Sequence, residues 1–137
     1  MTVSLRIGDA RALEQDAHYV IQYHAGHARA HAVLGSLRLS QKRYEEAEIH
    51  LTASLAAQVT AGALNDLAET YRQLGKLPEA EKQARAAVRL EPSFLPAWDS
   101  LGCVLRDSGR HSEAEAVFAC VKRLNLAGHW QIDNLHP

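Results

Sequence analysis

The chain has 137 residues, of which 47% are hydrophobic, and 15 Lys and Arg against 16 Asp and Glu give a formal net charge of -1. This size and composition predict one globular domain with its own core. The charge provides no basic excess for nucleic acid or anionic lipid, and charged residues interrupt every apolar stretch, so we expect neither a nucleic-acid nor a membrane partner.

The first predicted element is a helix over about 10–24. It follows a glycine–aspartate turn and carries Leu13, Ala17 and Val20 at helical spacing. A turn followed by one amphipathic helix is typical of the second half of a helical hairpin. We therefore expect residues 10–24 to cap the N-terminal side of the fold as half a repeat.

Three copies of one pattern follow, over 28–61, 61–94 and 95–128. The last two copies match at an offset of 34 residues, and the first junction is one residue shorter. Apolar residues recur at spacings of three and four within each copy, which predicts two amphipathic helices rather than strands. The helices are expected over 28–40, 44–57, 61–74, 78–90, 95–108 and 112–124.

Turn residues mark the boundaries between these helices. Gly75 and Gly109 stand where the first helix of each later pair should end, because glycine enters the left-handed conformation without steric cost. Pro92 disfavours continuation of the helix before it. The first copy departs from this pattern, with Lys42 in the place of Gly75 and Arg38 in the place of Tyr71, so we expect that copy to be distorted.

The spacing Trp98-x-x-Leu101-Gly102-x-x-Leu105, followed by Ala114-x-x-x-Phe118, resembles the signature of the tetratricopeptide-repeat (TPR) family over roughly 28–128. The resemblance implies an all-α fold, a right-handed superhelical stack of antiparallel helix hairpins. It predicts a single domain over 1–137 with about three full repeats and the N-terminal half-repeat. Residues 129–137 are expected to form a short C-terminal extension, in which Trp130, Ile132 and Leu135 cover the last hairpin.

The resemblance also implies a non-enzymatic scaffold whose first helices line a concave groove that holds a peptide or helix of a partner protein. Arg72 and Arg106 occupy the same place in successive copies and could grip a carboxylate or phosphate together. Alternatively, Arg72 pairs with Glu69 at i, i+3. The family's groove-facing places correspond to Arg29, Ser36, Asn65, Glu69, Arg72, Asp99, Cys103 and Arg106.

Family members that clamp the acidic C-terminal tails of chaperones use Lys, Asn and Arg at particular first-helix places. Asp66 stands at one such place here and would repel a terminal carboxylate, so a chaperone tail is disfavoured as the ligand. The remaining places hold Ala32, Ser36, Pro96 and Ser100.

Metal binding and catalysis are not expected. His24, His27 and His31 have spacings that one continuous helix could present to a metal, but the expected turn between hairpins separates them. Cys103 and Cys120 should be free thiols without a base or oxyanion site beside them. We therefore predict no catalytic residue, metal or cofactor, and the two cysteines without an N-terminal apolar run favour the cytoplasm.

Two other functions stay open at this point. Repeats of this kind are often joined to glycosyltransferase, sulfotransferase or kinase domains, so the chain could be the targeting or regulatory region of a larger enzyme. The end faces of the stack could also recruit a second copy of the chain and form a homo-oligomer.

Overall fold

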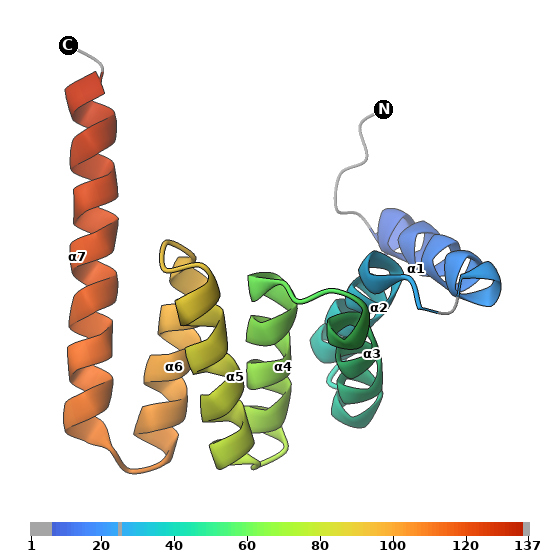
Figure 1. The fold of residues 1–137 in the computed structure, drawn as a ribbon, viewed down its shortest axis with the longest axis horizontal. Helices are drawn as coiled ribbons and strands as arrows, with labels where there is room; N and C mark the ends of the chain where they lie inside the picture. The colour runs from blue at the N-terminus through green and yellow to red at the C-terminus, as the bar shows by residue number, and fades with distance from the viewer. Residues whose placement is uncertain (1–6, 25, 136–137) are drawn as a thin grey trace.

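The computed structural model describes the backbone of residues 7–24 and 26–135, and the side chains of residues 10–22, 24 and 26–125. Within these residues the chain forms seven α-helices and no strand. None of the described helices is both long and apolar enough to cross a membrane. The helices are α1 (Ile7–Tyr23), α2 (Ala28–Ser40), α3 (Tyr44–Ala57), α4 (Ala61–Gln73), α5 (Leu77–Leu90), α6 (Leu95–Asp107) and α7 (His111–Leu135) (Figure 1).

The five helices from α2 to α6 begin and end within one residue of their predicted positions. The first and last helices differ from the prediction. α1 begins at Ile7, so Gly8 and Asp9, expected as a turn, lie inside the helix. α7 runs to Leu135 instead of ending near residue 124. The chain has no proline between residues 97 and 136, and a single glycine costs a helix only about 1 kcal/mol. The backbone over 129–135, expected as a separate short extension, therefore continues α7. The side chains of Trp130, Ile132 and Leu135 lie outside the described ones.

The three turns within the hairpins have one geometry. Gly75 and Gly109 have φ of 79° and 81°, as predicted, and Lys42 adopts the same left-handed conformation with φ of 63°. In the first turn, Arg43 N–H donates to the carbonyl of Arg38 over 2.8 Å, and the corresponding bonds close the other two turns. The turn at Lys42 is therefore not distorted, which corrects the expectation for this part of the first copy.

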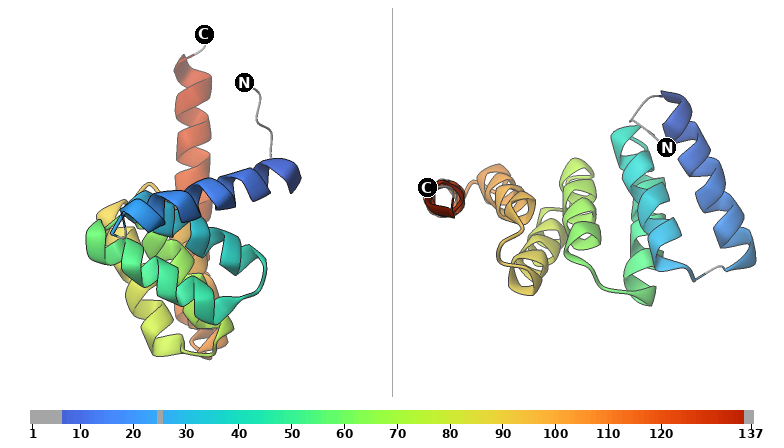
Figure 2. Two further views of the ribbon diagram at one scale, coloured as in Figure 1. Left: turned by 90° about the vertical axis from the view of Figure 1, so that its right-hand side faces the viewer. Right: turned by 90° about the horizontal axis from the view of Figure 1, so that it is seen from above.

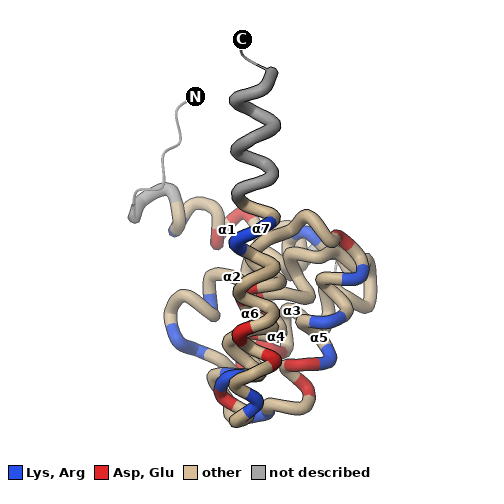
Figure 3. The backbone as a smooth tube through the Cα atoms, turned by 90° about the vertical axis from the view of Figure 1, so that its left-hand side faces the viewer, with Lys and Arg blue, Asp and Glu red and all other residues tan. Residues whose placement is uncertain are grey.

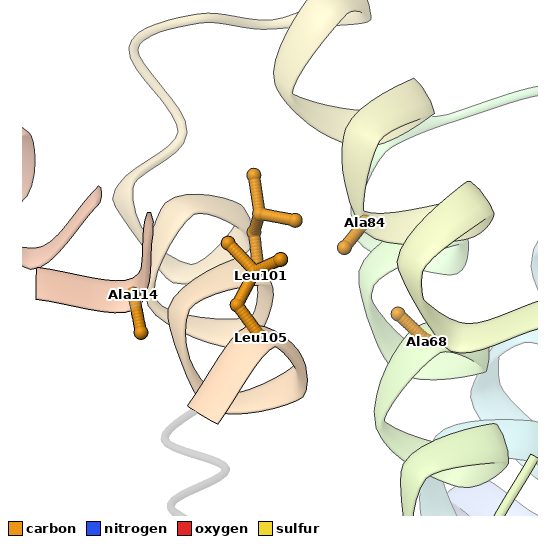
Figure 4. Packing of buried hydrophobic residues seen from close by; sticks show 5 residues of the cluster. All are labelled: Ala68, Ala84, Leu101, Leu105 and Ala114. Atoms are coloured by element: carbon orange, nitrogen blue, oxygen red, sulfur yellow. The ribbon is translucent and has the colours of Figure 1, made fainter. Parts of the chain in front are cut away.

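The first and third hairpins each pack a glycine of the first helix against a large residue of the second. A Cβ at Gly35 would lie 2.6 Å from Leu51 Cγ, and one at Gly102 would lie 2.5 Å from the ring of Phe118. These glycines allow the two helices to approach so closely that no larger residue fits without movement. Between hairpins, Leu101 and Leu105 of α6 lie between Ala114 of α7 and the alanines of α4 and α5 (Figure 4).

The stack curves toward its first helices. Among the described residues, α2 contacts α4 and α4 contacts α6, whereas the second helices α1, α3, α5 and α7 do not contact one another. Seen from above, α4 and α6 lie on one side and α5 on the other (Figure 2). Because spacing is shorter between first helices, the face formed by α2, α4 and α6 is on the inside of the curve. We call it the first-helix face.

Arg38 gives the first hairpin a polar centre. Its side chain is buried, and its guanidinium contacts the Glu14 carboxylate of α1 and lies 3.1 Å from Glu46 Oε2 of α3. The buried His31 packs on His50, with 3.2 Å between their Nδ1 atoms. Arg38 thus joins three helices through charge, where Tyr71 in the next copy packs against an apolar cluster.

Candidate functional site

The eight predicted groove residues lie on the three first helices α2, α4 and α6. Four of them are exposed at the surface: Arg29, Ser36, Asp99 and Arg106. The other four are half-buried: Asn65, Glu69, Arg72 and Cys103.

Arg72 is held by two carboxylates from different helices. Its Nε and Nη2 donate to the two oxygens of Glu69 over 3.0 and 2.6 Å, and its Nη1 donates to Asp107 Oδ2 over 2.9 Å. These bonds raise the pKa of Arg72, with Glu69 as the largest cause. The predicted i, i+3 pair with Glu69 is present, and Asp107 of α6 extends it across the first-helix face.

Arg106 and Arg72 are separated by a carboxylate, so the two arginines do not form one open anion site. Asp107 is between the two cations, because its Oδ1 lies 3.9 Å from Arg106 Nε while its Oδ2 accepts from Arg72. The Arg106 side chain is 53% exposed, compared with 21% for Arg72. Of the two arginines proposed to grip an anion, Arg106 is therefore the accessible one.

Neighbouring first helices are also joined by a neutral hydrogen bond. Ser100 Oγ donates to Asn65 Oδ1 over 2.6 Å. Both cross-links, Asn65 with Ser100 and Arg72 with Asp107, connect residues 35 positions apart. Neither Asp107 nor this role of Ser100 was predicted from the sequence. Both pairs are separated by one repeat length plus one, an offset that depends on how successive hairpins pack.

Between α2 and α4, the residues that correspond to Asn65 and Ser100 are Ala32 and Asp66. Alanine offers no hydrogen-bonding group, and the Asp66 carboxylate has no hydrogen bond or ion pair among the described side chains. Burial, with Glu69 as the second cause, raises the pKa of Asp66 to about 6. This carboxylate would be stabilised by a cationic or hydrogen-bond-donating group of a ligand.

Cys103 lacks the surroundings of a nucleophile. Burial and the nearby Asp99 carboxylate raise the pKa of its thiol, which disfavours the reactive thiolate. Cys103 and Cys120 are free thiols.

The three histidines with suggestive spacing do not share a helix. α1 ends before His24, and His27 caps the start of α2, where its Nδ1 accepts from Ala30 N–H over 3.1 Å. His31 packs on His50 within the first hairpin. Among the described residues, no group of three or more His, Cys, Asp or Glu is placed to hold a metal ion.

Charges of both signs alternate over the surface. Lys and Arg positions lie beside Asp and Glu positions around the α6–α7 end (Figure 3). Several of them form short ion pairs, such as Arg110 with Glu81 and Glu113.

Stacked helical hairpins with a curved row of first helices define the chain as an α-solenoid. Residues 60–90 match the family model described as "Tetratricopeptide repeat". The structure is similar to the crystal structure of MamA, with a TM-score of 0.80 and 21% identity over 90% of this chain and 72% of that chain. The matched repeat and the shared fold agree with the tetratricopeptide-repeat signature in the sequence.

Two further comparisons concern proteins whose names carry a function. The second TPR of Spaghetti (RPAP3), bound to the HSP90 peptide SRMEEVD, superposes with a TM-score of 0.68 and 25% identity over 82% of this chain and 92% of that chain. The human "Protein O-mannosyl-transferase TMTC2" is 37% identical over 89 residues. That match covers 62% of this chain but only 11% of the length of the human protein.

Proposed function

We propose that the chain is a non-catalytic scaffold that holds a peptide or helix of a partner protein on its first-helix face. The observation that carries this proposal is the arrangement of polar groups on the inside of the curve. Arg29 and Asp99 are exposed, and Arg106 is 53% exposed with only Asp107 near it, at 3.9 Å. Asp66 is half-buried and has no side-chain partner among the described residues. A TPR structure of similar fold is described as bound to a peptide, which supports the same use of this one.

The predicted groove residues do not contribute equally in this proposal. Charge reversal of Arg72 would leave Glu69 and Asp107 beside a third negative charge, so it would disturb the fold as well as binding. Asp99 and Arg106 are exposed, so their side chains can be changed without breaking a buried contact. They are the better positions for a binding test.

The experiment begins with partners recovered by affinity purification and cross-linking to the first-helix face. A fluorescent peptide from the cross-linked segment is then titrated with the protein. We expect Asp99→Lys combined with Arg106→Glu to weaken binding by about tenfold or more, because two rim charges become repulsive. Lys82→Glu, at an exposed position of α5 outside this face, is the matched control. Unchanged affinity of the double variant would place the binding surface elsewhere.

The ligand we propose is not an acidic chaperone tail. Asp66 is a carboxylate within the first-helix face, and Ala32 and Ser36 on α2 supply no cation. An acidic C-terminal peptide would therefore meet repulsion at the centre of the face. Titration with the peptide SRMEEVD tests this proposal directly, and saturable binding at micromolar concentration would contradict it.

A second candidate function is that of a repeat region within a larger enzyme. It is favoured by the match to a named mannosyltransferase, of which this chain spans about a tenth of the length. An antibody against residues 61–107 would then detect an endogenous protein much larger than 15.1 kDa. A single band near 15.1 kDa would exclude this candidate. We propose the cytoplasm as the location of the scaffold, which fractionation with the same antibody can test.

A further inference from the structure

Two histidines join the helices of the first hairpin. The Nδ1 atoms of His31 on α2 and His50 on α3 lie 3.2 Å apart, and the ring centroids lie 5.4 Å apart. The same two places hold Leu64 and Gln83 in the second hairpin, and Trp98 and Val117 in the third. None of those four side chains gains a proton near neutral pH. Of the three full copies, only the first has titratable rings at this contact.

The contact limits how many protons the pair can hold. A hydrogen bond between two Nδ1 atoms needs one nitrogen to donate and the other to accept. Two neutral rings can form this bond, and so can one neutral ring and one cation. Two cations cannot, because both Nδ1 atoms then carry a hydrogen. The folded pair therefore holds at most one positive charge, whereas in the unfolded chain each histidine titrates near its ordinary pKa of about 6.5 and both are charged at about pH 5.

The surroundings oppose even the first proton. His31 is buried and His50 is half-buried. Burial is the largest cause that lowers the pKa of His50, followed by the charges of His31 and of Arg38 on α2. His18 of α1 acts in the same direction, and Glu46 of α3 acts weakly against it.

The carboxylates beside the pair are already bound. Glu14 of α1 and Glu46 of α3 both contact the buried guanidinium of Arg38, and His18 Nε2 lies 3.5 Å from Arg38 Nη2. From α4, Tyr71 packs against α3 and stays neutral in this pH range, because burial raises its pKa. The two carboxylates therefore offset the charge of Arg38 and do not serve as counter-ions for a second imidazolium.

We propose that the contact between His31 and His50 is an acid-sensitive contact that loosens the first hairpin as the pH falls from about 6.5 to about 5. The opened hairpin binds at least one proton more than the closed one, so a falling pH favours opening. Each excluded proton shifts the equilibrium about tenfold for each pH unit. α1, α2 and α3 lie together at one end of the stack (Figure 1). Because hairpins in such a stack contact only their neighbours, this end can open while α6 and α7 stay folded.

The second hairpin supplies the matched variant. His31→Leu combined with His50→Gln places the residues of Leu64 and Gln83 at this contact. Urea unfolding is measured for this variant and for the unchanged protein at about pH 7.5 and about pH 5. On going to the lower pH, we expect the unfolding constant of the unchanged protein to rise about tenfold or more relative to that of the variant. Asp66 is present in both chains, so its own titration cancels in this comparison.

The control is His111→Gln, at an exposed position of α7. This variant should keep the pH dependence of the unchanged protein. An equal pH dependence of the double variant and the unchanged protein would overturn the proposal.

An NMR titration tests the contact without any substitution. Long-range ¹H–¹⁵N spectra report the protonation of each imidazole between about pH 7.5 and about pH 5. We expect at most one of His31 and His50 to be charged as long as the amide shifts of α2 and α3 stay those of the folded hairpin. Two charged rings with unchanged amide shifts would contradict the proposal.

Amide hydrogen exchange tests where the protein opens. After correction for the intrinsic exchange rate, acidification should weaken protection in α1, α2 and α3 more than in α6 and α7. An equal loss of protection along the chain would refute local opening. α2 also carries Arg29 and Ser36 of the first-helix face, so opening would alter that face. None of these measurements uses a partner, so their failure would leave the proposed function untouched.

Discussion

Replacement of Asp66 by Asn is expected to stabilise the fold at neutral pH and to leave its stability unchanged near pH 3. The pKa of Asp66 rises from 3.8 to about 6 because of burial and the neighbouring Glu69 carboxylate. Below the lower value, the carboxyl is protonated in both the folded and the unfolded chain and does not affect the equilibrium. Between the two values the unfolded chain ionises first, so stability falls as pH rises, and above about pH 6 the loss is complete.

The size of this effect follows from the two pKa values. The difference corresponds to about 3 kcal/mol at about 1.4 kcal/mol for each pH unit. Asp66 is half-buried, and water screens part of its charge, so we expect Asp66→Asn to gain about 1–2 kcal/mol at neutral pH. Asn keeps the shape of the side chain without its charge.

Urea unfolding followed by circular dichroism measures this gain at about pH 3 and about pH 7.5. Asp99→Asn is the control, because Asp99 is an exposed carboxylate on the same face. The reasoning would be refuted if Asp66→Asn had the stability of the unchanged protein at the higher pH. It would also be refuted if Asp99→Asn gained as much.

Three other predictions test the packing. Lys42→Gly should raise the free energy of unfolding by about 0.5–1 kcal/mol, because φ of 63° strains a residue with a Cβ. Gly75→Lys should lower the free energy of unfolding for the same reason. Thermal unfolding measures both effects. Arg38→Leu should lower the free energy of unfolding by about 1–2 kcal/mol and speed amide hydrogen exchange in α1, because Arg38 contacts Glu14 of that helix. Unchanged exchange in α1 would show that the ion pairs of Arg38 do not hold this helix. Gly102→Ala should lower the free energy of unfolding by about 1–3 kcal/mol, because the added methyl group meets the Phe118 ring. Adding Phe118→Leu to the same chain should recover part of this loss.

The hairpins could be predicted from the sequence because each is specified by nearby residues. Gly75 and Gly109 determine their turns locally, and the small residue at Gly102 is explained by one helix packing on the next. Lys42 was harder to interpret, since a left-handed Lys is uncommon and only the surrounding bonds show that the turn tolerates it. The end of α7 could not be predicted because the sequence there contains no strong terminator.

The sequence predicted which helices carry the candidate site, but it did not predict the contacts between them. The repeat located Asn65 and Arg72 on the first-helix face, yet their partners Ser100 and Asp107 depend on the stagger between successive hairpins. A stagger of one residue beyond the repeat length cannot be obtained from a single repeat. Arg38 illustrates the same limit, because its partner Glu14 lies on a helix outside the three full copies.

The internal bonds of the first-helix face determine which of its residues can contribute to affinity. A ligand anion would have to compete with Glu69 and Asp107 for Arg72, and the bond it forms would replace one already made. Arg106 and Asp99 begin exposed to water, so each gives a modest gain that salt weakens. Asp66 is different, because its ionised form already bears a cost of burial that a ligand cation would offset. A partner with a Lys or Arg placed over α4 would therefore gain more than one with an acidic group over α6, and binding of such a partner should lower the pKa of Asp66 in a ¹³C NMR titration.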